Sequence, residues 1–116
     1  MSILRVKKDD IIFNEGTYSD CAFIIERGRF EVSRKNPDGT SSVLGVLKTG
    51  DIFGEMGLID GGARSATVKA LEDGAISVLS RESFEGLAER NPQALIPLLK
   101  VLTTRLRNTI QKTVAA

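Results

Sequence analysis

Residues 53–68 read Phe-Gly-Glu-Met-Gly-Leu-Ile-Asp-Gly-Gly-Ala-Arg-Ser-Ala-Thr-Val. Phe53 closes an apolar segment, and the stretch ends in the strand-like Ala66-Thr67-Val68. The glycines between them mark a switch from strand to helix. Glycines at such a switch let backbone N–H groups approach an anion closely. Arg64 adds a planar guanidinium that can hold phosphate oxygens through two hydrogen bonds, and Ser65 adds a hydroxyl and a backbone N–H. Together these groups predict a phosphate-binding loop.

Glu55 has the wrong charge for a simple phosphate site, because a carboxylate repels a phosphate at short range. It should therefore face a donor, either a sugar hydroxyl or the guanidinium of Arg64. One acceptor, one cation and several free N–H groups predict a sugar phosphate of low charge. The plain alternative is a surface turn in which Glu55 and Arg64 form a solvated ion pair, since glycine patterns also match by chance.

The overall composition excludes several classes of protein. The chain has 116 residues, which suits a single domain over 1–116 with one core. Its formal net charge is +1, so nothing favours general binding to nucleic acid or to a membrane. It contains one cysteine and no stretch typical of a signal peptide or a membrane span, so we expect a cytoplasmic protein.

Histidine is absent from the sequence, and this absence argues against an enzyme. Ser-His-Asp and Cys-His catalysis both need imidazole, which is also the commonest general base. One cysteine and scattered carboxylates cannot replace imidazole in most zinc or iron sites. We therefore expect no catalytic residue, no metal ligand and no cofactor. A phosphodiesterase with Glu55 as its base is the enzymatic alternative, but it would lack a group that activates water.

Short apolar segments separated by turn signals precede the quoted stretch. Segment 21–25 is continuous and apolar, and segment 29–33 alternates between apolar and polar residues, so both are expected to be strands. The Asn-Pro-Asp-Gly sequence at 36–39 predicts a turn that pairs the second of these strands with 43–47.

A second hairpin is expected after the quoted stretch, because segments 67–71 and 75–79 flank an Asp-Gly turn. Gly16 and Gly28 interrupt the earlier strands, and we assign them to bends at the corners of a barrel rather than to ligand contacts. Many short strands at close spacing are typical of a small barrel or jelly roll.

The last third of the chain is predicted to be helical. Ser80 is a good N-cap, and Pro97 should either kink the following helix or delay its regular part. Apolar residues recur every three or four positions over 95–110, which predicts a long amphipathic helix. The predicted fold is α+β and mainly β, with a jelly-roll-like β-barrel over about 1–79 and C-terminal helices over about 80–114.

The quoted stretch closely resembles the phosphate-binding cassette of cyclic nucleotide-binding domains, the family of the catabolite activator protein and of the protein kinase A regulatory subunits. The resemblance extends from Asp10 to about Arg107 and implies a β-barrel that binds a cyclic nucleoside monophosphate. It also implies a last helix that moves as a lid and controls an attached effector. The matching positions of the cassette are Phe53-Gly54-Glu55, Gly57-Leu58 and Arg64-Ser65-Ala66-Thr67-Val68.

The resemblance also implies a role for individual residues. Glu55 would accept the ribose 2′-hydroxyl, Arg64 would pair with the cyclic phosphate, and Thr109 would contact the base from the last helix. The ligand would be cAMP or cGMP, and cAMP is favoured because cGMP binders of the family often have threonine where this chain has Ser65. Further hydrogen bonds would come from Ser65 and from the backbone of Gly54, Met56 and Gly57.

Members of this family usually control an effector, and almost nothing follows the last predicted helix here. We expect either a sensor that acts through an unknown effector protein or a piece of a larger protein that contains the effector domain. The apolar stripe over 95–110 also makes a homodimer through the C-terminal helix a candidate. The alternative function is a protein-interaction module on the same fold that binds no ligand. The intact Glu55, Arg64 and Ser65 argue against it.

Overall fold

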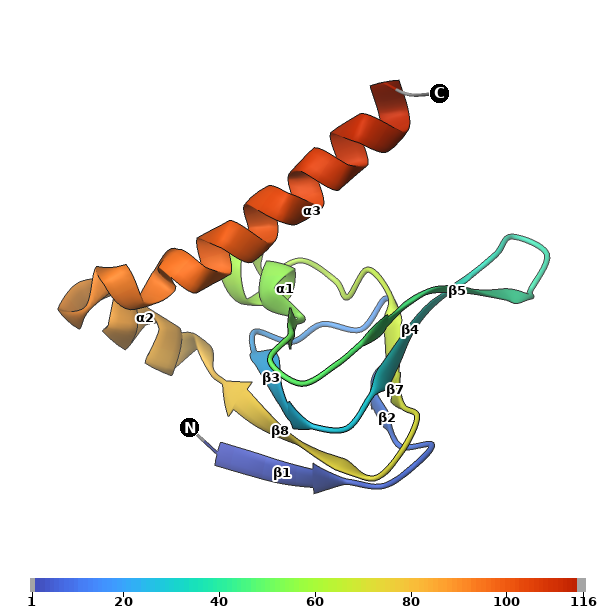
Figure 1. Cartoon of the computed structure of the whole chain (residues 1–116), viewed down its shortest axis with the longest axis horizontal. Coiled ribbons are helices and arrows are strands. Elements are labelled where there is room, and N and C mark those ends of the chain that lie inside the picture. The colour runs from blue at the N-terminus through green and yellow to red at the C-terminus, as the bar shows by residue number, and fades with distance from the viewer. Residues whose placement is uncertain (1, 115–116) are drawn as a thin grey trace. The chain divides into compact units, whose positions relative to one another are not determined.

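The computed structural model describes residues 2–114, with the side chains of residues 2–108. The chain forms two compact units, Met1–Arg81 and Glu82–Ala116. Within the described residues, all strands and the short helix α1 belong to the first unit, and the later helices form the second (Figure 1).

Two four-stranded antiparallel sheets make up the first unit. Consecutive strands change sheet at every step except from β4 to β5, so the chain winds between two layers. The described strands thus form two open sheets, and the prediction of a mainly β, jelly-roll-like fold followed by helices is confirmed. In spatial order, one sheet contains β1 (Ser2–Val6), β8 (Gly74–Leu79), β3 (Ala22–Arg27) and β6 (Ile52–Phe53), and the other contains β2 (Ile11–Phe13), β7 (Thr67–Ala70), β4 (Phe30–Lys35) and β5 (Ser41–Leu47).

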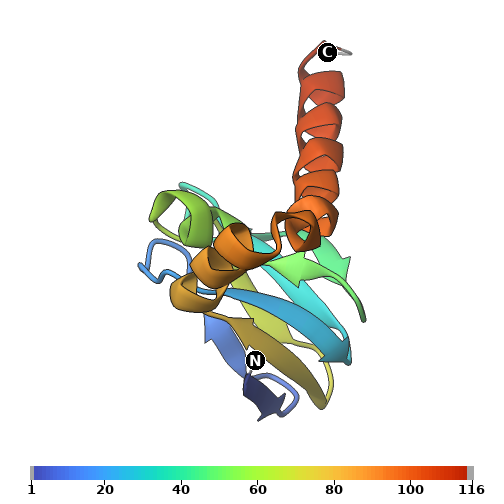
Figure 2. The ribbon, with the colours of Figure 1, turned by 90° about the vertical axis from the view of Figure 1, so that its left-hand side faces the viewer.

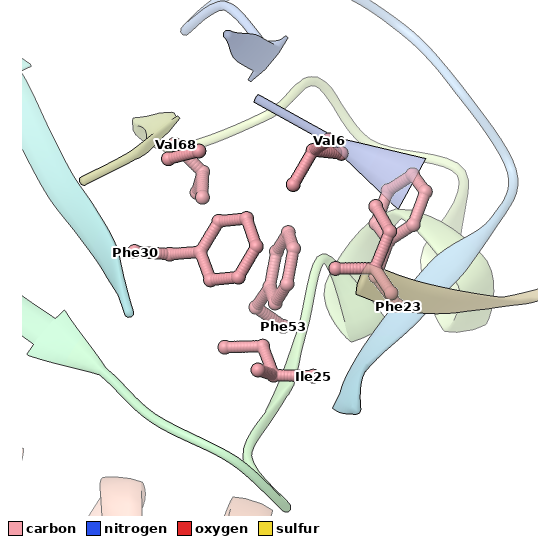
Figure 3. Close-up of a cluster of buried hydrophobic side chains, with 8 residues drawn as sticks. Val6, Phe23, Ile25, Phe30, Phe53 and Val68 are labelled. Carbon is pink, nitrogen blue, oxygen red and sulfur yellow. The ribbon is translucent and has the colours of Figure 1, made fainter. Parts of the chain in front are cut away.

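An apolar core lies between the sheets and holds them together (Figure 3). Phe30 and Val68 come from one sheet, and Phe23, Ile25 and Phe53 come from the other. The rings of Phe23 and Phe53 stack with centroids 5.2 Å apart, and Phe30 lies 6.0 Å from Phe53. Aromatic rings bury large apolar areas and add specific ring contacts. The core therefore anchors β6, whose last residue, Phe53, is the first residue of the quoted stretch.

The first predicted hairpin is confirmed. Strands β4 and β5 pair from Phe30 with Leu47 to Lys35 with Ser41, and the turn between them closes with a 2.7 Å hydrogen bond from the Asn36 N–H to the Thr40 carbonyl. The two strands are neighbours in the sequence and a short turn joins them, so the turn residues were enough to predict this pairing.

The second predicted hairpin is wrong, because β7 and β8 lie in different sheets. β7 pairs with β2 and β4, whereas β8 pairs with β1 and β3. Gly74 lacks the positive φ that a type I′ turn requires. A Cβ on Gly74 would instead overlap the carbonyl oxygen of Arg27, so this glycine permits close approach to β3. Gly16 and Gly28 lie on other connections between the sheets, as predicted.

The helices of the second unit follow the predicted order. Helix α2 (Arg81–Arg90) begins directly after Ser80, and a short 3-10 helix, η1 (Pro92–Leu95), leads into α3 (Ile96–Val114). Pro97 lies in the first turn of α3, where its missing N–H is not needed, so it delays the helix rather than kinking it. Figures 1 and 2 both show α3 as one continuous helix. Of the helices between residues 2 and 114, none combines the length and apolarity needed to cross a membrane.

Candidate ligand-binding site

The cassette (residues 53–68) passes from β6 through the short helix α1 (Glu55–Asp60) to β7. Gly54 precedes α1 with φ 76°, a left-handed conformation that L side chains rarely adopt. A Cβ on Gly54 would also lie 2.7 Å from Nη1 of Arg64. Glycine is therefore required both for the switch from strand to helix and for the close approach of the guanidinium. Helix α1 lies beside β3 in both ribbon views (Figures 1 and 2).

Arg64 is only 4% exposed, and neutral groups hold its guanidinium. Nη1 donates to the Gly54 carbonyl and Nη2 to the Cys21 carbonyl, each at 2.8 Å. The Phe13 ring lies against the guanidinium, with Cζ 4.3 Å from the ring centroid. The N–H on Nε is also buried, and it finds no hydrogen-bond acceptor among the described residues.

This environment leaves the Arg64 guanidinium incompletely satisfied. A buried charge is costly unless it is paired, and a buried donor without an acceptor adds a further penalty. The oxygen partners of the Arg64 guanidinium are two neutral carbonyls, and its other recorded contacts are the sulfur of Cys21 and the rings of Phe13 and Phe23. The site therefore offers a preorganised cation whose Nε donor is unused, which suits an anionic oxygen ligand.

Glu55 is 1% exposed at the start of α1, even deeper than Arg64. The alternative of a solvated ion pair between these two residues is therefore wrong, because both side chains are buried. A buried carboxylate can accept several hydrogen bonds in fixed directions, which is what recognition of a sugar hydroxyl would need. Ser65 and the side chain of Met56 are exposed, with 51% exposure for Met56.

The structure brings most of the predicted site residues together in one loop–helix–loop. Thr109 lies in α3 of the second unit, and its side chain is outside the part of the chain that the structure describes. Within that part, no group of three or more His, Cys, Asp or Glu side chains is placed to hold a metal ion. The residues brought together are Gly54, Glu55, Met56, Gly57, Arg64 and Ser65.

The sequence did not reveal the second wall of the site, the β2–β3 loop (residues 14–21). The Arg64 N–H donates to the Thr17 carbonyl at 2.8 Å, and the Arg64 carbonyl accepts from the Gly16 N–H at 2.8 Å. A Cβ on Gly57 would lie 2.7 Å from the Ser19 carbonyl oxygen, so the loop packs tightly on α1. The turn signal around Gly16 predicted a loop here, but no local signal linked it to the cassette.

This chain is similar to known proteins along most of its length. The family model described as the cyclic nucleotide-binding domain matches residues 3–91. The cyclic AMP receptor protein of Thermus thermophilus is 34% identical over 96 residues, which cover 83% of this chain and 44% of that protein. Lysophospholipase nte1 of Aspergillus terreus is 26% identical over 109 residues, which cover 94% of this chain and 7% of the enzyme. The chain thus spans less than half the length of these curated relatives.

Solved structures show the same architecture. The catabolite activator protein of Thermus thermophilus superposes with a TM-score of 0.91 at 29% identity, covering 97% of this chain and 53% of that chain. The EAL enzyme Bd1971 matches with a TM-score of 0.72 at 37% identity in its cAMP-bound form and in its cGMP-bound form. These two matches cover 97% and 98% of this chain and 30% of the enzyme chain.

Proposed function

This chain belongs to the family of cyclic nucleotide-binding domains, and from that premise we propose which nucleotide it binds, which residues bind it and how binding is transmitted. As a member of the family it is a regulatory domain that binds a cyclic nucleotide. The proposed ligand is cAMP in preference to cGMP, bound at the cassette. Movement of α3 then passes the signal to an effector. The proposal gives the chain no catalytic residue and no cofactor.

The observation that carries the proposal is the burial of Arg64 among neutral partners. Arg64 is 4% exposed, and its Nε N–H finds no acceptor among the residues described. A cyclic phosphate diester carries one negative charge, so one guanidinium with a free donor can balance it. In the proposed complex a phosphate oxygen accepts from Arg64, and the exposed Ser65 hydroxyl beside it donates a further hydrogen bond.

The proposed role of Glu55 is to bind the ribose. Glu55 is 1% exposed and is the first residue of α1, directly after Gly54, whose carbonyl accepts a hydrogen bond from Arg64. A carboxylate accepts a hydrogen bond from a hydroxyl but repels a phosphate, so Glu55 and Arg64 suit opposite sides of a ribose cyclic phosphate. The backbone of Gly54, Met56 and Gly57 completes the proposed set of contacts.

The proposed preference for cAMP rests on one residue of the cassette and on one relative. Ser65 stands where cGMP binders of the family often have threonine, and a curated relative is named for cyclic AMP. The EAL enzyme was solved in a cAMP-bound form and in a cGMP-bound form, so this one relative binds both nucleotides. We therefore express the preference as the ratio of the affinities of this chain for cAMP and cGMP.

Helix α3 is the proposed transmitter and the proposed dimer interface. It continues for 19 residues and carries Leu99 and Leu106 with 54% and 61% of their surfaces exposed. These leucines are seven positions apart and so share one face of the helix. An exposed apolar face of this kind suits pairing with a second copy of the chain. The base contact proposed for Thr109 would link this helix to the bound nucleotide.

A thermal-shift titration of the full chain with cAMP, cGMP and AMP tests the proposal. A ligand that binds only the folded state raises its stability with concentration, by about 2.7 kcal/mol at one hundred times Kd. We expect a rise for cAMP at lower concentration than for cGMP and none for AMP. No shift with either cyclic nucleotide would instead favour the interaction module that binds no ligand.

A further inference from the structure

The thiol of Cys21 lies against the buried arginine of the site. Its Sγ is 3.7 Å from Nη2 of Arg64, and the Cys21 carbonyl accepts a 2.8 Å hydrogen bond from the same nitrogen. The Ser19 hydroxyl lies 3.2 Å from the sulfur. Cys21 is partly exposed, so a small reagent can approach it. Reactive cysteines are found in such electropositive, partly exposed surroundings.

A separate observation is that the guanidinium in contact with Cys21 keeps an unused donor. Arg64 is 4% exposed, its recorded partners are neutral, and its Nε N–H has no acceptor among the described residues. An oxygen atom bonded to the Cys21 sulfur would add an acceptor next to Nη2, on a guanidinium whose Nε N–H has none. The Ser19 hydroxyl is close enough to the sulfur to contact the same oxygen.

We propose that Cys21 is a peroxide-reactive modification site whose oxidation competes with the cyclic phosphate for Arg64. The sulfur attacks the distal oxygen of a hydroperoxide, so that an S–O bond forms and the O–O bond breaks. The thiol proton passes to the released alkoxide, which leaves as an alcohol, or as water when the reagent is hydrogen peroxide. The sulfur loses two electrons and the peroxide gains them, which yields a sulfenic acid.

The competition follows from the geometry around one guanidinium. Once Arg64 donates to the sulfenic oxygen of Cys21, fewer of its donors are available for a phosphate oxygen. A bound phosphate would in turn take the donors that the sulfenic oxygen needs. The inference rests on the proposed function, because the competitor is the cyclic phosphate. It adds a thiol-based regulation to that same site.

The test treats the full chain with hydrogen peroxide and traps the sulfenic acid with a dimedone probe. Cys21 is the single cysteine of the sequence, so any trapped label reports on it alone. We expect a stoichiometric label and, by calorimetry, a loss of cAMP affinity of about tenfold, the size expected for one charge-assisted contact. Dithiothreitol should restore the affinity, because a thiol reduces a sulfenic acid.

Cys21→Ser is the matched control, compared with its own untreated form. It keeps both methionines, including the exposed Met56, so it reveals any effect of methionine oxidation. We expect no label and no change in affinity on treatment. An unlabelled wild-type thiol overturns the inference. So does a labelled thiol with unchanged cAMP affinity, or an equal loss of affinity in Cys21→Ser.

A comparison without ligand separates this inference from the proposed function. Arg64→Gln should slow the labelling of Cys21 severalfold, and an equal rate in the two proteins overturns the inference. If Arg64→Gln does not fold, protection of the wild-type thiol by saturating cAMP replaces the comparison, and no protection overturns the inference. If the untreated wild type binds no cyclic nucleotide, the proposed function fails, while the dependence of labelling on Arg64 is still measured.

Discussion

The guanidinium of Arg64 lies on the ring of Phe13, with its Cζ 4.3 Å from the ring centroid. Phe13 ends β2 and packs against Phe23 and Phe53 at centroid distances of 6.0 and 5.8 Å. The cation is thus fixed by the apolar core on one face and by the carbonyls of Gly54 and Cys21 at its edge. A cation held this firmly before the ligand arrives loses little conformational entropy on binding.

Removal of the Arg64 guanidinium should mainly lower the affinity for the ligand. We expect Arg64→Ala to lower the affinity for cAMP at least tenfold, on the order of 1.5–3 kcal/mol for a charge-assisted bond. Calorimetry measures the affinity. Arg29→Ala is the matched control, because its side chain is 60% exposed and paired with Glu72. Equal affinities of Arg64→Ala and wild type would contradict the assignment of Arg64 to the phosphate.

Glu55→Gln should weaken recognition of the ribose while the fold is kept. The amide has nearly the same shape as the carboxylate but is a weaker acceptor for a hydroxyl. We expect wild type to prefer cAMP over 2′-deoxy-cAMP about tenfold, the size of one hydrogen bond to a charged group, and we expect this preference to shrink in the variant. A variant that loses its cooperative unfolding transition would show instead that Glu55 is structural.

Phe13→Leu should show whether cAMP affinity depends on the aromatic ring of Phe13 or only on its apolar volume. Leucine keeps a large apolar side chain but removes the face that contacts Arg64, an interaction of about 0.5–2 kcal/mol. We therefore expect cAMP affinity to fall a few-fold, by calorimetry, after correction for folded fraction. Phe30→Leu is the control, since Phe30 is fully buried in the same core and has no recorded contact with Arg64. Equal changes in cAMP affinity in the two variants would contradict a specific role of the Phe13 ring in positioning Arg64.

Gly57→Ala should push the β2–β3 loop away from α1. The added Cβ would lie 2.7 Å from the backbone oxygen of Ser19 and 3.2 Å from Nη1 of Arg64. Overpacking of this kind costs about 1–3 kcal/mol, so we expect a lower unfolding temperature and weaker cAMP binding. Gly86→Ala in α2 is the control, because a Cβ on Gly86 would meet no described atom within 4 Å and alanine favours the helix. If Gly57→Ala has the same unfolding temperature as wild type, the β2–β3 loop can move away from α1 without a loss of stability.

A homodimer through α3 should depend on its exposed leucines. We expect light scattering to give a dimer mass for wild type and a monomer mass for Leu106→Glu, because a charge in an apolar interface is costly. Leu106 is 61% exposed, so the monomer itself should tolerate the change. Thr104→Glu is the control, since Thr104 is exposed and faces away from Leu106 along the helix period. A monomer mass for wild type with and without cAMP would count against the dimer.

The predictions that the structure confirmed rest on neighbours in the sequence. Strands β4 and β5 are joined by a short turn, and turn chemistry decides such pairings locally. The pairing of β7 and β8 failed because an Asp-Gly dipeptide also occurs where a chain crosses between sheets. Gly74 serves a close contact with Arg27 rather than a turn, and a contact between residues so far apart leaves no local pattern.

The sequence by itself determined the family, the jelly-roll-like class of the fold and the contiguous residues of the cassette, because glycines, Glu55, Arg64 and Ser65 lie within one short stretch. Only the tertiary structure decided how deeply Arg64 is buried and what surrounds it. Its partner Cys21 is 43 positions away, and Phe13 contacts it from strand β2. Contacts of this range arise when two sheets close on a common core, and packing in three dimensions sets them.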